Sequence, residues 1–582
     1  MIRKLARCVG EYKRSAILTP IFIVCEVLLE CLIPFIIAEL VNRIKAGCEF
    51  REIAMYGLTL FLMACLSLTF GALAGATAAT ASAGFSKNLR RMMYHRIQEY
   101  SFENIDRFSS SSLVTRMTTD IQYVQMSFMM IIRIAVRAPI MFLFAIIMAF
   151  VMGGPLALMF VIVVPILLSG LLIIAKKAMP MFRRIFKKYD KLNESIEENI
   201  KGMRVVKSFV REKDEKQKFA SVSEEVRDDF TRADRVVAFN GPLMQFCLYF
   251  NMIFVMLVGS HLIVSSGGEA LDVGQYSAIL TYGFQILSSL MTLSMVYVTL
   301  TISTESAKRI VEVLDEESTI VSPENAVKTV KDGSIDFSGV SFKYSTRAER
   351  SALEGINLHI GSGQVVGILG GTGSSKSTLV QLIPRLYDVS EGTVKVGGTD
   401  VRSYDLRTLR DSVAMVLQKN ELFSGTIAEN LRWGNKDATD EELREACRLA
   451  CASEFIDSFP DGYNTKIEQG GTNVSGGQKQ RLCIARALLK KPKILILDDS
   501  TSAVDTKTDA MIRKGFREFI PETTKIIIAQ RVSSVMDADL IVVMDGGRID
   551  AVGTHETLLR ENAIYQEVYY SQNSASSAEE EA

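Results

Sequence analysis

The sequence has no excess of charge of either sign, because its 66 Lys and Arg residues balance 66 Asp and Glu residues. This balance gives no support to a nucleic-acid-binding protein, which usually carries a basic excess. The nine cysteines show no paired spacing, and His95, His359 and His555 show no ligand spacing. The sequence therefore predicts neither a disulfide framework nor a zinc site.

Few charged residues interrupt six apolar runs that precede residue 305. Each run is about as long as a bilayer core requires of a helix, roughly 20 residues. The runs are 15–41, 54–83, 131–152, 155–175, 240–264 and 275–301. One such run could be a buried helix of a soluble protein, but six predict an all-α, six-helix transmembrane bundle. The first run is too long for a secretory signal and lacks a cleavage site, so we expect a membrane helix there.

Basic residues are concentrated in three of the segments that flank the runs. These are Arg3, Lys4, Arg7, Lys13 and Arg14, then Lys87, Arg90, Arg91 and Arg96, then Lys176, Lys177, Arg183, Arg184, Lys187 and Lys188. Basic segments stay on the cytoplasmic side, although Arg43, Lys45 and Arg51 in the first outer loop depart from this rule. The sequence thus predicts a multi-pass protein of the cell (inner or plasma) membrane, with its N-terminus and second half cytoplasmic.

Two of the connecting segments, 84–130 and 176–239, are long, charged and helix-patterned. Helical arms of this length would extend about 33 Å beyond the bilayer. At their tips lie 108–120 and 196–210, where we expect short transverse helices that dock on another domain. An ordinary helical hairpin turn is the alternative.

Polar side chains inside the runs are candidates for a transport path. Glu26 and Glu30 share one face of the first helix, and Arg133 and Arg137 share one face of the third. Glu and Arg could instead pair with each other for structural reasons. The candidate path comprises Glu26, Glu30, Gln245, Tyr249, Asn251 and Gln285.

A glycine-rich loop in VVGILGGTGSSKSTLVQLI (365–383) predicts a phosphate-binding P-loop between a strand and a helix. Lys376 would reach the outer phosphates and Ser377 would ligate magnesium. Ser375 departs from the glycine that the pattern has before the lysine, and its Cβ restricts the backbone. The predicted phosphate-binding residues are Gly370, Gly371, Thr372, Gly373, Ser374, Ser375, Lys376, Ser377 and Thr378.

A second acidic element lies in KPKILILDDS (491–500), where a buried strand ends in Asp498. That carboxylate would lie opposite the P-loop and hold magnesium directly or through water. The two elements together predict a P-loop ATPase of α/β fold that binds ATP and Mg²⁺.

The segment NVSGGQKQRLCIARALL (473–489) resembles the signature of ATP-binding cassette proteins. The resemblance implies that Val474, Ser475, Gly476, Gly477 and Gln478 bind the γ-phosphate of ATP held by a facing subunit. It also implies that Tyr344 stacks on adenine and that Gln418 senses magnesium, beside the metal ligands Ser377 and Asp498. The loop that crosses to the other nucleotide site would comprise Ser502, Ala503, Val504 and Asp505.

The order of six spans and then a cassette resembles exporter half-transporters of the multidrug and lipid type. The resemblance implies a type IV exporter fold, with a RecA-like core and a helical subdomain near 425–490 in the second half. The expected organisation is a cytosolic segment 1–14, a transmembrane domain 15–305, a linker 306–334, a cassette 335–570 and a disordered tail 571–582.

Two positions depart from the family pattern within the nucleotide site. The general base, a glutamate in the family, is Asp499, and the switch histidine is Gln530. Shortening the base by one carbon withdraws it by about 1.5 Å, and a misplacement of about 1 Å costs on the order of 100-fold in rate. Glutamine cannot become cationic or carry a proton.

These departures leave more than one function open. We favour a subunit of a heterodimeric exporter of amphipathic drugs, lipids or peptides, with a weakly hydrolytic site of its own and an intact signature for its partner. That partner would be a homologous half-transporter that carries the glutamate and the histidine. The alternatives are an active homodimeric exporter with tolerated changes, and a regulatory or channel-like assembly with little ATP turnover.

Overall fold

The computed structural model describes residues 1–345, 349–499 and 504–580. The chain divides into two compact units. The helical unit comprises Met1–Glu99 and Phe108–Glu316, and the C-terminal unit comprises Tyr100–Arg107 and Glu317–Ala582.

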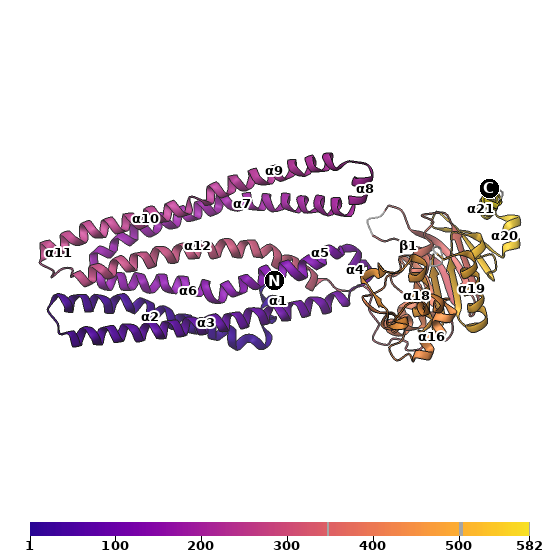
Figure 1. Cartoon of the computed structure of the whole chain (residues 1–582), viewed down its shortest axis with the longest axis horizontal. Helices are drawn as coiled ribbons and strands as arrows, with labels where there is room; N and C mark the ends of the chain where they lie inside the picture. The colour runs from indigo at the N-terminus through magenta and orange to yellow at the C-terminus, as the bar shows by residue number, and fades with distance from the viewer. Residues whose placement is uncertain (346–348, 500–503, 581–582) are drawn as a thin grey trace. The chain divides into compact units, whose positions relative to one another are not determined.

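The helical unit is built from long helices that lie alongside one another (Figure 1). Its helices are α1 (Ile2–Arg7), α2 (Lys13–Lys45), α3 (Phe50–Gln98), α5 (Ser110–Thr115), α6 (Ile121–Gly153), α7 (Phe160–Lys201), α8 (Met203–Ser208), α9 (Glu212–Val237), α10 (Asn240–Phe254), α11 (Ser260–Ser266) and α12 (Val273–Asp315). Helix α12 continues ten residues into the expected linker and ends at Asp315.

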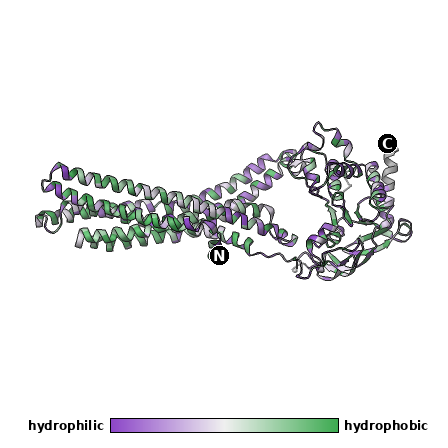
Figure 2. Ribbon diagram, turned by 90° about the horizontal axis from the view of Figure 1, so that it is seen from below, coloured by the Kyte–Doolittle hydropathy of each residue, from purple (hydrophilic) through white to green (hydrophobic). Residues whose placement is uncertain are grey.

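Five helical stretches of the described chain are long and apolar enough to cross a membrane. One of them, Ser110–Phe182, contains two of the six predicted spans, because the chain reverses between α6 and α7 at Gly154, whose φ is 50°. Figure 2 shows that hydrophobic residues cover one part of the length of this unit and polar residues the other. The long helices thus combine a membrane-spanning part with a water-exposed extension.

The segment 108–120, which we expect to dock on another domain, belongs to the helical unit. Arg116 forms an ion pair of 2.8 Å with Glu312 of α12, and Asp120 accepts a 2.7 Å hydrogen bond from Arg309. The segment that joins the C-terminal unit is the preceding helix, α4 (Phe102–Arg107). The docking of 108–120 on another domain stays a prediction.

Two sheets form the framework of the C-terminal unit. A six-stranded sheet has the order β12-β11-β3-β10-β9-β6, and a four-stranded antiparallel sheet has the order β2-β1-β4-β5. The strands are β1 (Ile335–Phe342), β2 (Leu353–Ile360), β3 (Val365–Gly370), β4 (Glu391–Val396), β5 (Thr399–Asp400), β6 (Val413–Val416), β7 (Gly425–Thr426), β8 (Lys466–Ile467), β9 (Ile494–Asp498), β10 (Thr524–Ile528), β11 (Leu540–Asp545) and β12 (Arg548–Gly553).

The central strands of the six-stranded sheet are parallel and buried on both faces. In β9, Ile494 and Ile496 enter one apolar core, while Leu495 and Leu497 enter the other. This continuous apolar run is typical of a parallel strand covered on both sides. Because β3 and β9 both pair with β10 in parallel, their carboxyl ends meet at one edge of the sheet.

Helices cover the sheet and form a separate helical subdomain before β9. They are α13 (Lys376–Gln381), α14 (Leu406–Ser412), α15 (Ile427–Leu431), α16 (Asp440–Leu449), α17 (Ser453–Asp457), α18 (Gly476–Leu488), α19 (Thr506–Phe519), α20 (His555–Glu561) and α21 (Ala563–Glu580). The tail from residue 571, expected to be disordered, continues α21 to Glu580. The apolar residues that pack on the core, Ile564, Tyr565, Val568 and Tyr569, all lie in the part of α21 that precedes residue 571.

Candidate active site

The P-loop occupies the carboxyl end of β3 and leads into α13. Gly370 has a φ of 159°, and a Cβ there would lie 2.3 Å from the carbonyl oxygen of Met544, so only glycine fits. Ser375 has a φ of 67° and a ψ of 26°, which is the left-handed conformation. A side chain is strained in that conformation, so the departure from glycine at Ser375 has a structural cost.

The side chain of Lys376, the first residue of α13, folds back onto the P-loop. Its Nζ donates to the carbonyl oxygens of Gly370 at 2.9 Å and Gly371 at 2.8 Å, and to Ser374 Oγ at 3.1 Å. Burial lowers the pKa of the Lys376 ammonium, and the nearby carboxylates of Asp498 and Asp499 oppose this shift. The ammonium group of Lys376 thus lies where the phosphates of a nucleotide would bind.

The predicted magnesium ligands lie together at the carboxyl edge of the sheet. Ser377 Oγ donates a 2.9 Å hydrogen bond to Asp498 Oδ1. Burial raises the pKa of the Asp498 carboxyl, the Ser377 hydrogen bond lowers it, and the neighbouring Asp499 raises it further. A hydroxyl and a buried carboxylate side by side are the oxygen donors that Mg²⁺ prefers, so the residues present fit MgATP.

The two positions that depart from the family pattern contact each other. Gln530 Nε2 donates to Asp499 Oδ2 at 2.8 Å, and Gln418 Nε2 lies 3.4 Å from the same oxygen. The shorter acid is thereby directed toward two side-chain amides. A general base needs an oxygen that is open to a water molecule, and in Asp499 this oxygen already accepts hydrogen bonds.

Tyr344, the predicted adenine-stacking residue, lies next to the P-loop helix. Its hydroxyl is 2.9 Å from Thr378 Oγ1, and its ring meets that of Tyr387 at a centroid distance of 5.2 Å. Burial raises the pKa of the Tyr344 phenol. Tyr387 in turn donates a 2.7 Å hydrogen bond to Asp106 of α4, and its ring lies 6.0 Å from that of Phe102. Sequence reasoning missed Tyr387, because no motif includes it.

The signature residues form the start of α18. Ser475 Oγ accepts from the backbone N–H of Gln478 at 3.3 Å, and Gln478 Oε1 accepts from the N–H of Ser475 at 2.9 Å. This reciprocal pair is a capping box that fixes the first turn of the helix. Val474 packs partly buried against the core, Ser475 and Gly476 are exposed, and Gly477 is half-buried. The motif is therefore an ordered helix start with an accessible face.

The predicted crossing loop is described only in part. Val504 is buried, and Asp505 caps α19 by accepting from the N–H of Thr508 at 2.9 Å. Ser502 and Ala503 lie outside the described residues.

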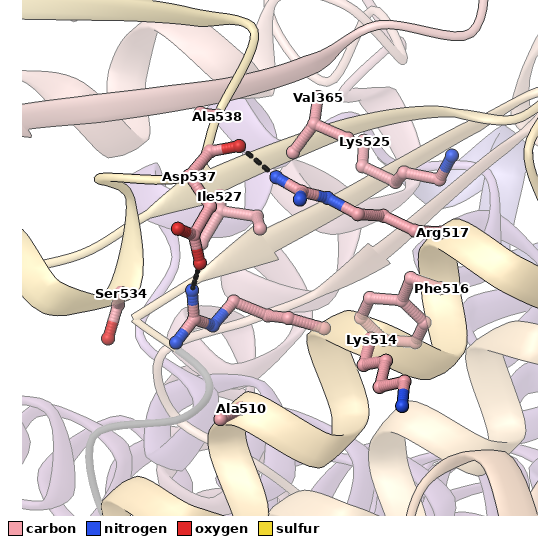
Figure 3. Close-up of a pocket in the computed structure, with 11 residues that line it drawn as sticks. Val365, Ala510, Lys514, Phe516, Arg517, Lys525, Ile527, Ser534, Asp537 and Ala538 are labelled. Atoms are coloured by element: carbon pink, nitrogen blue, oxygen red, sulfur yellow. Dashed lines mark hydrogen bonds and ion pairs between the residues drawn. The ribbon is translucent and has the colours of Figure 1, made fainter. Parts of the chain in front are cut away.

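A separate cavity of about 140 Å³ lies between α19 and β10 (Figure 3). Arg513 Nη1 donates to Asp537 Oδ2 at 3.0 Å, and Arg517 donates to the carbonyl oxygen of Asp537. These bonds link α19 to the segment that follows Gln530. The cavity thus lies beside the segment that follows Gln530, and none of the described residues that line it belongs to the P-loop.

The candidate path residues of the helical unit fall into different environments. Arg137 Nη2 donates to both carboxylate oxygens of Glu30 at 2.7 Å, and its Nη1 lies 3.3 Å from Glu26 Oε1. The Glu–Arg pairing that the sequence left open is therefore present. Gln245 and Tyr249 are exposed on α10.

Asn251 and Gln285 lie where α10 and α12 approach closely. A Cβ at Gly283 would lie 2.3 Å from Asn251 Nδ2. Asn251 Oδ1 and Gln285 Oε1 are buried, and neither has a hydrogen-bond partner within the described residues. An unsatisfied oxygen at membrane depth is costly, so these two amides are the strongest of the path candidates for a contact with another molecule.

Comparison with known proteins identifies the family of both halves of the chain. The model of the ABC transporter transmembrane region matches residues 16–290, and the ABC transporter model matches residues 353–502. The uncharacterized ABC transporter ATP-binding protein YfiB of Bacillus subtilis is 33% identical over 574 residues, which cover 98% of each chain. The uncharacterized ABC transporter ATP-binding protein MT1311 of Mycobacterium tuberculosis is 33% identical over 579 residues, again 98% of each chain.

The fold of a bacterial Atm1-family ABC exporter with ATP bound matches this one with a TM-score of 0.83 at 23% identity, over 96% of this chain and 98% of that one. Both halves of the chain are covered by these matches, and the relatives extend over its whole length. The chain therefore belongs to the ABC transporter family, and it joins a transmembrane domain of the type IV exporter fold to one ABC transporter ATPase domain.

Proposed function

We propose that this half-transporter is the weakly hydrolytic subunit of a heterodimeric exporter. The observation that carries the proposal is the 2.8 Å hydrogen bond between Gln530 and Asp499. This bond joins Asp499, at the position of the general base, to Gln530, at the position of the switch histidine. In the proposed assembly the chain binds MgATP at its own P-loop, and its signature completes the hydrolytic site of a partner that carries glutamate and histidine.

Hydrogen-bond chemistry supports a slow site in this chain. Bound MgATP supplies the γ-phosphoryl group, and the metal neutralises charge that develops on its oxygens. Asp499 has to accept a proton from the attacking water, but one of its oxygens accepts from the Gln530 amide at 2.8 Å. Gln530 cannot transfer a proton, and its neutral amide cannot form a charge-assisted hydrogen bond with the γ-phosphate. Each loss alone weakens catalysis, and here they occur together.

The signature supports the second part of the proposal. The capping box of Ser475 and Gln478 keeps the first turn of α18 formed, so its amides are ready to receive a phosphate. A subunit under no selection for ATP chemistry would not need this motif. Its presence beside a weakened base favours a role in the site of a facing subunit.

Contacts of the cassette supply a route for force toward the membrane. Phe102 and Asp106 of α4 both meet Tyr387, which meets Tyr344 beside the P-loop. Nucleotide binding at Tyr344 would therefore act on α4, and through α4 on α3 and α6. The second transverse helix, α8, exposes Met203 and Val205, an apolar surface suited to the cassette of the partner subunit.

The cargo that we propose is an amphipathic drug, lipid or peptide, moved outward across the cell membrane with the cassette on the cytoplasmic side. The buried amide oxygens of Asn251 and Gln285 would hydrogen-bond to its polar part. The many exposed apolar side chains of α10, among them Phe246 and Phe250, would receive its apolar part.

ATP hydrolysis tests the proposal most directly. The chain is purified alone and together with a homologous half-transporter that carries the glutamate and the histidine, and phosphate release is compared at saturating MgATP. We expect the pair to exceed the chain alone by on the order of 100-fold. Equal rates would favour the homodimeric alternative. Hydrolysis by the pair with no accumulation of amphipathic dyes or lipids in inverted vesicles would favour the regulatory alternative.

A further inference from the structure

The last helix of the cassette, α21, presents one continuous face to the core. Tyr565, Val568 and Tyr569 pack there, at the spacing i, i+3 and i+4 that brings side chains to one side of a helix. The next position of this face, i+7, is Gln572. An apolar residue is expected at this position of the buried face, but the chain has the amide side chain of Gln572.

The position of α21 is determined by its first turns. Tyr565 is fully buried, and its hydroxyl lies 2.7 Å from His555 Nδ1. Asn562 Oδ1 accepts from the N–H of Tyr565 at 2.8 Å. These contacts anchor the helix to α20 and to the core, so the location of Gln572 follows from the anchored end.

The Gln572 amide binds the backbone on both sides of Arg531. Its Nε2 donates to the carbonyl oxygen of Gln530 at 2.8 Å, and its Oε1 accepts from the N–H of Val532 at 2.9 Å. A side-chain amide that satisfies one carbonyl and one N–H of the same segment fixes that segment in both position and direction. The segment is the one that carries the switch position.

Other elements hold the same segment at its two ends. The N–H of Asp499 donates to the carbonyl oxygen of Ile528 at 3.0 Å. Ser534 Oγ lies 3.2 Å from Asp509 Oδ2 of α19. Between these two contacts, the side chain of Gln572 on α21 binds the backbone of residues 530 and 532.

We propose that Gln572 is a positioning residue for the switch, through which the C-terminal helix controls the reach of residue 530 toward residue 499. The Gln530 side chain that contacts Asp499 starts from the backbone that Gln572 holds. Undocking of α21 would release this backbone and weaken the contact. The role of residue 530 as a switch rests on the proposed function, but the backbone contact does not.

Three variants of the full-length chain test this inference. Gln572→Met keeps the length and helix preference of the side chain and removes both hydrogen bonds. Gln572→Glu keeps an acceptor for Val532 and loses the donor to Gln530. Gln566→Met is the matched control, because Gln566 on the same helix donates its amide to the carbonyl oxygens of Leu559 and Arg560, away from the switch.

Hydrogen exchange of residues 528–533 is the first measurement, because it does not depend on turnover. Gln572→Met is expected to accelerate exchange of the Val532 amide about tenfold, Gln572→Glu less, and Gln566→Met not at all. The second measurement is kcat against KM in the chain that also carries Asp499→Glu and Gln530→His. There Gln572→Met is expected to lower kcat about tenfold and leave KM within about twofold, since a misplaced switch affects the chemical step.

The inference is overturned if Gln572→Met matches Gln566→Met in both exchange and kcat. A general loss of folding would change KM and melting temperature in all three variants, which also counts against it. Fast hydrolysis by the native chain alone would contradict the proposed unequal sites, and kcat would then be measured in the native chain. The exchange result would still decide the role of Gln572.

Discussion

Restoring the two departing positions should convert the slow site into a hydrolytic one. In the native chain Gln530 Nε2 donates a hydrogen bond of 2.8 Å to Asp499 Oδ2, so one oxygen of the carboxylate is already engaged by the amide. Asp499→Glu advances the carboxylate by about 1.5 Å, and Gln530→His replaces the neutral amide with a group that can be protonated.

The size of the effect follows from the geometry. A displacement of about 1 Å changes rates on the order of 100-fold, and a placed general base contributes roughly 10²–10⁴-fold. We expect Asp499→Glu alone to raise kcat about tenfold, because the Gln530 amide still binds the acid. We expect the double variant to raise kcat by at least about 100-fold. This increase should exceed the product of the increases from the two single variants, because the two side chains contact each other.

Phosphate release by the lone chain in lipid nanodiscs is the assay. Adding Lys376→Ala to the double variant is the control, since activity that arises in this site requires its P-loop lysine. A double variant that stays within about threefold of the native chain would refute the reasoning. The low turnover would then have a cause other than the Asp499–Gln530 pair.

Three further predictions concern other parts of the chain. Ser375→Gly removes a left-handed strain of about 1 kcal/mol and should tighten binding of a fluorescent ATP analogue about fivefold; weaker binding would show that the serine is needed. Tyr387→Phe loses the 2.7 Å hydrogen bond to Asp106 and should lower the number of cargo molecules moved per ATP while ATP binding stays unchanged; an unchanged ratio would exclude this contact from force transmission. Arg137→Met leaves Glu30 without its cation and should lower the melting temperature in detergent by several degrees, at a cost below about 3 kcal/mol because the arginine is 39% exposed; an unchanged melting temperature would show that the pair does not stabilise the bundle.

Local patterns were sufficient for much of the nucleotide site. The P-loop and Asp498 each follow an apolar strand, and parallel strands place their carboxyl ends at one edge, so the 2.9 Å contact of Ser377 with Asp498 was foreseeable. The length of an apolar run likewise determines whether it can cross a bilayer, whatever its neighbours. The sequence also separated the two spans within Ser110–Phe182, because the apolar runs 131–152 and 155–175 are interrupted where the chain reverses at Gly154.

The contacts of the segment 108–120 involve residues that are distant in the sequence. Ser and Thr at 108–120 are compatible with a transverse helix, but Arg116 and Asp120 find charged partners nearly 200 positions away on α12. The helix that packs with the cassette, α4, is distinguished by Tyr387, a residue that no local pattern associates with it.

The sequence by itself determined the membrane helices, the P-loop, the signature and the absence of the usual base and switch residues, because each depends on residue types within one short segment. Only the tertiary structure decided that Asp499 and Gln530 contact each other, that Arg137 joins Glu26 and Glu30, and that Gln572 reaches the switch backbone. Periodicity places a side chain on a face of its own element, whereas its partner depends on how separate elements pack.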